Sequence, residues 1–334
     1  MAKLLDRKSV DVLLAAFNSE AYLSQQIESI LNQSYEDFKL IILDDYSTDG
    51  TQSLIEHYQS LDARIERIKP SSPFRNPIRS FEYLLGVSTA EVVFLSDHDD
   101  FWLPDKILEQ LNLMEGMDDG NMSPLLVASN TYVASDCFDD IKVLKRDYPS
   151  FHSASMIRWF NDLFPEQKTA YFSHSNLVVG HTIAVNRTLV ELSLPFPDEA
   201  RMHDWWLAIL ANVSGKIFID PRPMTIYRQH LQNYVGSSKL KHRLSIKALK
   251  RSGLPFKSLD QSLKQCSGAM KRASRVSSIR EFDSKLLSFL VSMPRLSCFS
   301  LYKGFLKFGL FSPRSDLPKL LGQILFIALH RPCR

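Results

Sequence analysis

The sequence predicts an α/β protein whose central sheet is mostly parallel and flanked by helices. Short apolar segments alternate with amphipathic helical patterns between residues 10 and 227, which is typical of such a sheet. Acidic residues directly follow two of the apolar segments, at positions 44–45 and 97–100. Because ligands of these sheets bind at the carboxyl ends of the strands, we expect the two acidic clusters to share one site.

The predicted strands are the apolar segments themselves. They cover residues 10–16, 40–43, 65–68, 92–95, 125–133, 178–185, 217–219 and 224–227. Helices are expected where apolar residues recur three or four positions apart, as at Leu23, Ile27 and Ile30. These helices lie around residues 23–31, 54–58, 81–85, 104–114, 186–194 and 200–213, with Asn18 or Ser19 as a cap of the first. Residues 135–173 are irregular and aromatic-rich and predict no element.

The second acidic cluster predicts a metal site. Asp97, Asp99 and Asp100 follow a fully apolar strand, and their like charges repel one another unless something offsets them. A hard divalent cation, Mg or Mn, takes oxygen ligands and would offset this charge. A solvated acidic turn is the alternative, but it does not explain why Phe101 and Trp102 follow the acids at once.

Charge divides the chain into two regions. The whole chain of 334 residues is 45% apolar with a net charge of +3, yet residues 237–334 hold 20 basic and 4 acidic residues, and residues 1–236 hold 20 and 33. We therefore expect a folded domain over residues 1–236 and a basic, mainly helical region over residues 237–334. This basic region is expected to associate with an anionic membrane surface. Nucleic acid would match the same charge, but no recognition motif accompanies it, so no nucleic-acid partner is expected.

The composition also bears on compartment. The four cysteines are far apart in the sequence and show no metal-binding or disulfide spacing, which fits a reducing compartment. The N-terminus lacks the apolar core of a secretory signal, and no segment approaches the roughly 20 apolar residues of a membrane span. We expect a cytoplasmic protein, peripheral on the cytoplasmic face of the inner membrane. P-loop and Rossmann fingerprints are absent, which disfavours enzymes that use ATP or NAD(P).

Six motifs occur in an order that resembles the family 2 glycosyltransferases of the GT-A fold. They are residues 16–20, 33–35, 44–51, 96–102, 203–206 and 227–230, the last followed by Asn233. Each motif alone is weak, but together they are specific. The branch they resemble most contains the rhamnosyltransferase-like enzymes of bacterial surface polysaccharide synthesis, and the resemblance covers residues 9–236.

This resemblance implies an inverting, metal-dependent transfer of a sugar from a nucleoside-diphosphate donor to a hydroxyl of a glycan or lipid-linked acceptor. The branch suggests rhamnose from dTDP-rhamnose. Residues 97–99 correspond to the family's DxD element, so Asp99, Asp97 and His230 are the expected metal ligands. The residues expected to bind the donor are Phe17, Asn18, Glu20, Asp44, Asp97, Asp100 and Arg228.

The resemblance also assigns the catalytic base to Asp204. A carboxylate must take the proton of the acceptor hydroxyl as that hydroxyl attacks. An acid placed at a helix N-terminus only for its charge is the alternative, but the neighbouring indoles favour a water-poor cleft that would raise its pKa. The residues expected on the acceptor side are Trp205, Trp206, His203 and His181.

Two other functions stay open on the sequence. A metal-dependent phosphoryl-transfer enzyme would hydrolyse the donor without an acceptor and would not need Asp204. The other alternative is a catalytically inactive glycan-assembly subunit. Nucleotide-sugar turnover that survives Asp99→Ala and Asp204→Asn would support it, because these carboxylates would then carry no reaction.

Overall fold

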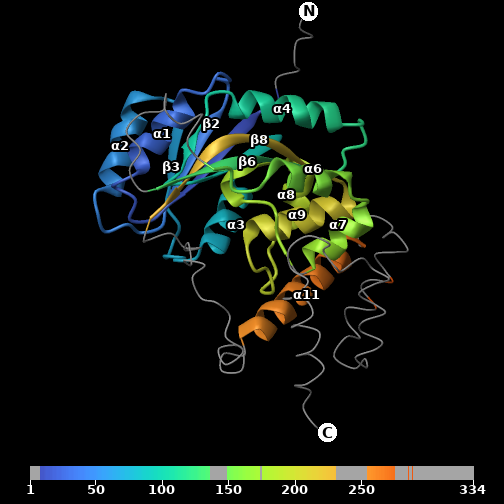
Figure 1. The fold of residues 1–334 in the computed structure, drawn as a ribbon. Helices are drawn as coiled ribbons and strands as arrows, with labels where there is room; N and C mark the ends of the chain where they lie inside the picture. Colours follow the sequence, from blue (N-terminus) through green and yellow to red (C-terminus); the bar gives the residue numbers. More distant parts are fainter. Residues whose placement is uncertain are drawn as a thin grey trace, which may run out of the picture.

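The computed structural model describes residues 8–135, 149–173, 175–230 and 254–274, and positions 285 and 288. Its centre is an eight-stranded sheet with helices on both faces (Figure 1). The strands are β1 (Val10–Ala16), β2 (Lys39–Asp44), β3 (Ile65–Ile68), β4 (Val92–Asp97), β5 (Phe101–Trp102), β6 (Leu125–Ser135), β7 (Ile183–Asn186) and β8 (Lys216–Gln229). They lie in the order β3-β2-β1-β4-β7-β6-β8-β5.

The predicted α/β class is confirmed, with a sheet that is mixed. Strands β3, β2, β1 and β4 pair in parallel, as do β6 and β8. The pairs of β4 with β7, β6 with β7 and β5 with β8 are antiparallel. The parallel half places the ends of β1, β2 and β4 at one edge of the sheet, which is where the acidic residues follow.

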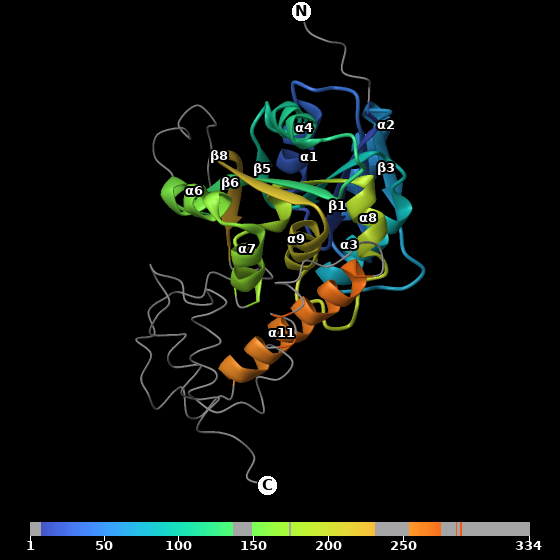
Figure 2. The same ribbon diagram turned by 90° about the vertical axis from the view of Figure 1, so that its right-hand side faces the viewer.

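The helices form one layer on each face, as Figure 2 shows. One layer contains α1 (Leu23–Leu31), α2 (Thr51–Leu61) and α4 (Lys106–Met117). The other contains α3 (Pro77–Val87), α6 (Ala154–Asp162), α7 (Pro165–Phe172), α8 (Arg187–Ser193) and α9 (His203–Ser214). A short 3-10 helix, η1 (Gly180–Thr182), precedes β7.

Strand β1 shows how the sequence divides between two cores. Val10, Val12 and Leu14 belong to the core under α1 and α4, whereas Leu13 belongs to the core under α3 and α9. Successive side chains of a strand point to opposite faces of the sheet, and a strand covered on both faces needs apolar residues at every position. This explains why β1 is apolar at every position except Asp11, whose buried carboxylate accepts a hydrogen bond from the Ser88 hydroxyl.

Several elements differ from the sequence prediction. The strand expected over residues 178–185 begins only at Ile183, because η1 occupies its first half. The two strands expected at 217–219 and 224–227 are one strand, β8, whose pairing with β6 shifts register on either side of Asn130. Helices α6 and α7 lie where no element was predicted, and both bury aromatic side chains in the core, Phe160 and Phe172.

Part of the basic C-terminal region packs on the folded domain. Helix α11 (Leu254–Ala273) lies against α9 and α7 (Figures 1 and 2). Cys266, Ala269, Met270 and Ala273 are buried in the core that α9 also fills. The boundary at residue 236 stays a prediction. Most of the region expected to meet a membrane lies outside the described residues, and no described helix is long and apolar enough to cross one.

Candidate active site

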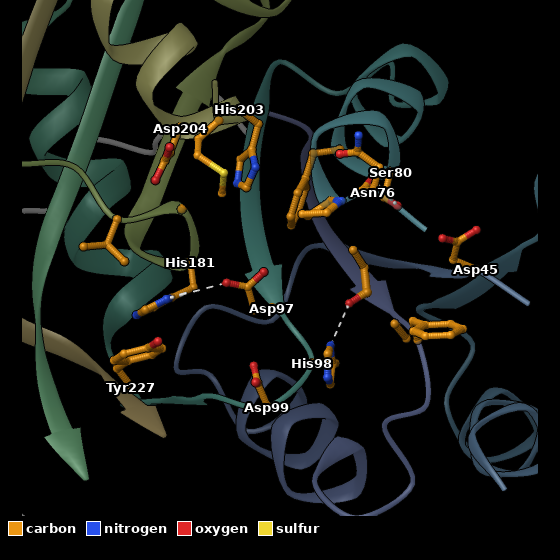
Figure 3. A pocket seen from close by; sticks show the side chains of 18 of the residues that line it. Asp45, Asn76, Ser80, Asp97, His98, Asp99, His181, His203, Asp204 and Tyr227 are labelled. Carbon is orange, nitrogen blue, oxygen red and sulfur yellow. Dashed lines mark hydrogen bonds and ion pairs between the residues drawn. The ribbon is translucent and has the colours of Figure 1, made fainter. Parts of the chain in front are cut away.

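A cavity of about 820 Å³ opens at the edge of the sheet where β1 and β4 end. Figure 3 shows side chains from distant parts of the sequence facing it. Its lining includes the ends of β1 and β4, the first turn of α3, η1, the first turn of α9 and the end of β8. Among the residues predicted for the site, those that line it are Phe17, Asn18, Asp97, Asp99, His181, His203, Asp204, Trp205 and His230.

Asp100 lies behind the cavity in a buried ion pair. Its carboxylate is 2.9 Å from Nδ1 of His181, and it also accepts a hydrogen bond from the backbone N–H of Arg228. Burial raises the pKa of Asp100 to about 6. Burial alone would lower the pKa of His181, but Asp100 outweighs it and raises that pKa to about 10. At neutral pH the pair therefore holds a carboxylate and an imidazolium.

Asp99 forms a second pair, with His230. Its Oδ2 lies 2.7 Å from Nε2 of His230, whose ring stacks on Tyr22 with centroids 4.6 Å apart. Burial favours the neutral acid, but the hydrogen bond from His230 and the charge of the nearby histidines lower the pKa of Asp99. Asp97, which lies between the two pairs, is partly exposed to the cavity.

Arg228 supports the acidic loop instead of lining the cavity. Its buried guanidinium donates to the backbone carbonyl of Asp99 at 3.0 Å and to the side-chain oxygen of Gln25. It also stacks over the ring of Tyr22, 4.9 Å from the ring centre. Direct contact with a diphosphate was expected from the sequence, whereas the structure places this side chain outside the cavity lining, where it fixes the backbone that carries Asp99 and Asp100.

The donor set at this edge fits a hard divalent cation. Ligand atoms of Asp97, Asp100 and His181 all lie within 4.8 Å of one another. Asp99 and His230 border the same cavity. Carboxylate oxygens suit Mg and Mn, and an imidazole nitrogen is compatible with Mn.

Asp204 reaches the cavity from the first turn of α9. It is 8% exposed, and its Oδ1 accepts a hydrogen bond from the backbone N–H of Trp205. Burial raises its pKa to about 7, and the charge of Asp97 adds to this effect. Asp97, Asp99 and Asp204 thus face one cavity, although Asp204 is far from the other two in the sequence.

The two indoles that follow Asp204 have different surroundings. Trp205 lines the cavity, and its Nε1 donates to the carbonyl of Phe172. Trp206 is fully buried in the core, and its Nε1 donates to the carbonyl of Ser193. Consecutive helix residues point about 100° apart, so both rings cannot face the same cleft. The structure does not bring Trp206 to the acceptor side.

The loop after β1 is held by bonds that the sequence reasoning did not foresee. Asn18 has a left-handed backbone, with φ of 47°, and its Oδ1 accepts from the N–H of Thr48. It does not cap α1, whose N-cap position is Tyr22. Glu20 also points away from the cavity, because its carboxylate accepts from the N–H of Gly50.

At the end of β2 the acid that faces the cavity is Asp45. Asp44 is buried in an ion pair with Arg67, 3.2 Å away, and lies outside the cavity lining. Asp45 lines the cavity and accepts hydrogen bonds from the backbone N–H groups of Phe74 and Arg75. Neighbouring side chains at a strand end point to opposite sides. This alternation could have predicted from the sequence that only one of Asp44 and Asp45 faces the cavity.

Other lining residues carry no motif in the sequence. They include Arg75, Asn76, Ser80, Phe151, His152 and Asn176, whereas Tyr227, which also lines the cavity, belongs to the last of the six motifs. The ring of Tyr227 stacks on His181, with centroids 5.5 Å apart and planes 16° apart. The loops and the first turn of α3 bring these side chains to the site, so only the tertiary structure identifies them.

The fold matches solved glycosyltransferase structures. TarS of S. aureus in complex with UDP has a TM-score of 0.52 and 14% identity, with 96% of this chain and 80% of that chain covered. A mannosyltransferase, PcManGT from Pyrobaculum calidifontis in complex with GDP-Man and Mn2+, has a TM-score of 0.52 and 15% identity, with 98% and 82% covered. The architecture is therefore the GT-A fold predicted from the motifs.

Sequence comparisons identify the family to which the chain belongs. The model of the family "Glycosyl transferase family 2" matches residues 11–191, so the chain belongs to this family and is a glycosyltransferase. It is similar to the dTDP-rhamnosyl transferase RfbG of Shigella flexneri, at 25% identity over 247 residues, which are 72% of this chain and 78% of that protein.

Proposed function

We propose that this glycosyltransferase moves a sugar from a nucleoside diphosphate to a hydroxyl of a glycan or lipid-linked acceptor in bacterial polysaccharide synthesis, with inversion at the anomeric carbon. The observation that carries the proposal is the shared cavity. It is lined at one edge of the sheet by Asp97 and Asp99 and by the buried acid Asp204. The first two suit the diphosphate end of a donor, and the third suits an attacking alcohol.

In this mechanism Asp204 is the general base. The acceptor oxygen forms a bond to the anomeric carbon as its proton passes to the Asp204 carboxylate, and the bond from that carbon to the diphosphate oxygen breaks. A base is most effective when its pKa lies near the working pH, and burial brings the pKa of Asp204 to about 7. Attack from the face opposite the diphosphate inverts the configuration of the sugar.

A divalent cation, Mg or Mn, would be held by Asp97, Asp99 and His230, which border the cavity. When bound, it neutralises the negative charge that develops on the departing diphosphate. Asp100 and His181 are the rival ligand set with Asp97. A cation at either set would have to replace a buried contact between a histidine and a carboxylate, that of His181 with Asp100 or that of His230 with Asp99, so substitutions have to distinguish the two sets.

The nucleoside is placed at the opposite end of the cavity from Asp204. Figure 3 shows Asp45 on the far side from Asp204, with Asp97 between them. Phe17 and Arg75 line this end, with the guanidinium 5.9 Å from the centre of the Phe17 ring. An aromatic ring and a carboxylate can stack on and hydrogen-bond a pyrimidine base. We therefore assign base recognition to Asp45 together with Phe17.

The similarity to a dTDP-rhamnosyl transferase makes dTDP-rhamnose the first donor to test. The experiment offers purified protein a panel of dTDP-, UDP- and GDP-sugars with Mg or Mn and follows nucleoside diphosphate release with and without a glycan acceptor. We expect release that depends on cation and acceptor for one donor class, and loss of at least about 100-fold in Asp204→Asn. Asp37→Asn removes an exposed carboxylate and serves as the matched control.

The same assay separates the alternatives. Donor hydrolysis that needs no acceptor and survives Asp204→Asn would identify a phosphoryl-transfer enzyme instead. Release that survives both Asp99→Ala and Asp204→Asn would show that these carboxylates do not carry the reaction. If His230 is a ligand, His230→Ala should raise the Mg or Mn concentration needed for half-maximal release, whereas His181→Ala should leave that concentration unchanged.

The basic region is proposed to hold the enzyme at the cytoplasmic face of the inner membrane, where lipid-linked acceptors reside. Residues 237–334 carry 20 Lys and Arg against 4 Asp and Glu. Each basic residue near an anionic surface contributes about 1 kcal/mol. Sedimentation with vesicles that contain phosphatidylglycerol should carry the protein down at low salt, while binding to neutral vesicles would contradict an electrostatic attachment.

A further inference from the structure

The side chain of His203 is buried at the cavity wall without a partner. It is 3% exposed, and neither Nδ1 nor Nε2 has a hydrogen-bond partner among the described residues. Burial lowers its pKa to about 4, so the ring is neutral at physiological pH. A buried polar group without a partner is uncommon and calls for an explanation, because it loses its bonds to water and gains none in return.

Two neighbours fix this ring. On one side it packs on Phe81, with ring centroids 4.1 Å apart and planes 33° apart. On the other side it touches Gly180, where an added Cβ would lie 2.5 Å from Nε2 of His203. Any side chain at position 180 would therefore displace the imidazole. These contacts hold the ring in one place, with Nε2 toward Gly180 and neither nitrogen hydrogen-bonded to a described residue.

The His203 ring borders the part of the cavity that a transferred sugar would occupy. Figure 3 shows it between Asp204 and the residues of α3, Asn76 and Ser80, facing the space above Asp97. All of these residues line the same cavity. With the diphosphate at Asp97 and the attacking hydroxyl at Asp204, the anomeric carbon and its sugar ring occupy the interval between them.

We propose that His203 binds hydroxyl groups of the transferred sugar and helps to select the donor. This inference rests on the proposed function and concerns the sugar part of the donor instead of the acceptor. A neutral imidazole offers one N–H donor and one nitrogen acceptor, and a sugar hydroxyl can do both. A site with such a buried donor and acceptor discriminates strongly against a sugar that lacks the matching hydroxyl, because the imidazole then makes no hydrogen bond.

The test compares the binding of each nucleoside diphosphate with and without its sugar. Calorimetric titration measures the Kd of dTDP and UDP alone, and then of dTDP-rhamnose and UDP-glucose, in the presence of Mg or Mn. His203→Phe keeps an aromatic ring against Phe81 but has no polar atom, and His203→Gln keeps one donor group and one acceptor group. Gly180→Ala displaces the imidazole without removing it.

For the sugar conjugate that wild type prefers, we expect His203→Phe to weaken binding by about 10- to 100-fold. The Kd of the free nucleoside diphosphate should change less than twofold, and Gly180→Ala should act like His203→Phe. His203→Gln should recover most of the lost affinity. Thermal unfolding of each variant shows whether the fold is intact.

Three results would overturn the inference. Equal weakening of both ligands would assign His203 a purely structural role. Unchanged donor binding with a raised KM for the acceptor would move His203 to the acceptor side. Wild-type protein that binds no nucleoside diphosphate at all would remove the proposed function itself, and the diphosphate-only titration makes that failure recognisable before any His203 variant is used.

Discussion

Asp204 is a buried carboxyl group in the first turn of α9, and its protonation affects both catalysis and stability. The helix N-terminus and the N–H of Trp205 favour the ionised form, while burial and the charge of Asp97 oppose it. Burial wins, and the pKa of Asp204 lies at about 7. Two measurable consequences follow for this residue.

The first consequence is a pH dependence of the transfer rate. Only the deprotonated carboxylate accepts a proton, so kcat/KM should fall by about tenfold per pH unit on the acidic side of an apparent pKa near that of Asp204, and should level off above it. Initial rates measured from acidic to alkaline buffer check this. Circular dichroism over the same range serves as the control that the protein stays folded. A flat profile on the acidic side would contradict the base assignment.

The second consequence concerns the stability of Asp204→Asn. A folded-state pKa of about 7 exceeds the unfolded value, so the ionised group destabilises the fold fully above pH 7 and no longer does so below the unfolded pKa of about 4. The variant should therefore unfold several degrees above wild type at about pH 8, with a difference that shrinks as the pH falls through 7 toward 4. Differential scanning calorimetry measures it, and a variant that is less stable than wild type at the alkaline end would show that the carboxylate stabilises the fold.

At the scale of elements, the end of α9 depends on the glycine that follows it. A Cβ at Gly215 would lie 1.9 Å from the backbone carbonyl oxygen of Pro124, which opens β6 and cannot move without shifting that strand. The same carbonyl accepts from the N–H of Lys216 at 2.9 Å. This contact sets where α9 stops and where β8 begins.

Alanine at Gly215 should therefore destabilise the protein by at least about 2 kcal/mol, because backbone must move to admit the methyl group. The matched change is Gly116→Ala, on the exposed side of α4, where nothing lies within 4 Å of the added Cβ. That change should stabilise by about 0.5 kcal/mol. Urea unfolding gives both values, and equal effects of the two substitutions would contradict the packing explanation.

Strand β8 has a second role besides closing the sheet. Its last residues carry Tyr227 and Arg228 to the acidic loop after β4, and the strand is followed directly by His230. Because β8 pairs with β6 in parallel over its full length, the position of these residues follows from the register of that pairing. The acidic loop is thus held by a strand more than 120 residues further along the chain, as in the Arg228–Asp99 hydrogen bond separated by 129 positions.

At the scale of the whole molecule, α11 attaches part of the C-terminal region to the folded domain. Gln265 accepts a hydrogen bond from the backbone N–H of Arg201, and the Arg201 guanidinium reaches Ser262. These bonds hold the segment that leads into His203 and Asp204. The same guanidinium lies over the ring of Trp205, 4.7 Å from its centre.

A carboxylate placed in the interface between α11 and α9 should destabilise the whole folded domain and not α11 alone. Met270 is fully buried against the core of α9, so Met270→Asp should lower stability by about 3 kcal/mol or more and reduce activity in proportion to the unfolded fraction. Gln261→Asp places the same group on the exposed side of α11 and should change stability by less than about 1 kcal/mol. Thermal unfolding of both variants checks the prediction. A cooperative transition of wild-type stability in Met270→Asp would mean that α11 is dispensable.

The alternation of strands and helices could be predicted from the sequence, and so could the edge of the sheet where the acids gather. Apolar periodicity and the position of charges are local properties, which a chain displays before it folds. The sequence also pointed to Asp97, Asp99 and Asp204 as residues for one site, through motifs with fixed spacing, and they line one cavity.

Which of two adjacent residues faces that cavity became clear from the folded arrangement. Asp45 faces it instead of Asp44, and Trp205 instead of Trp206, because the pleat of a strand and the turn of a helix send adjacent side chains in different directions. Arg228 lies outside the cavity lining because it bonds to the backbone of Asp99 and to Gln25. His203 is packed between Phe81 and Gly180 and has no hydrogen-bond partner among the described residues. The outcomes at Arg228 and His203 depend on contacts between residues far apart in the chain, and no local pattern in the sequence encodes them.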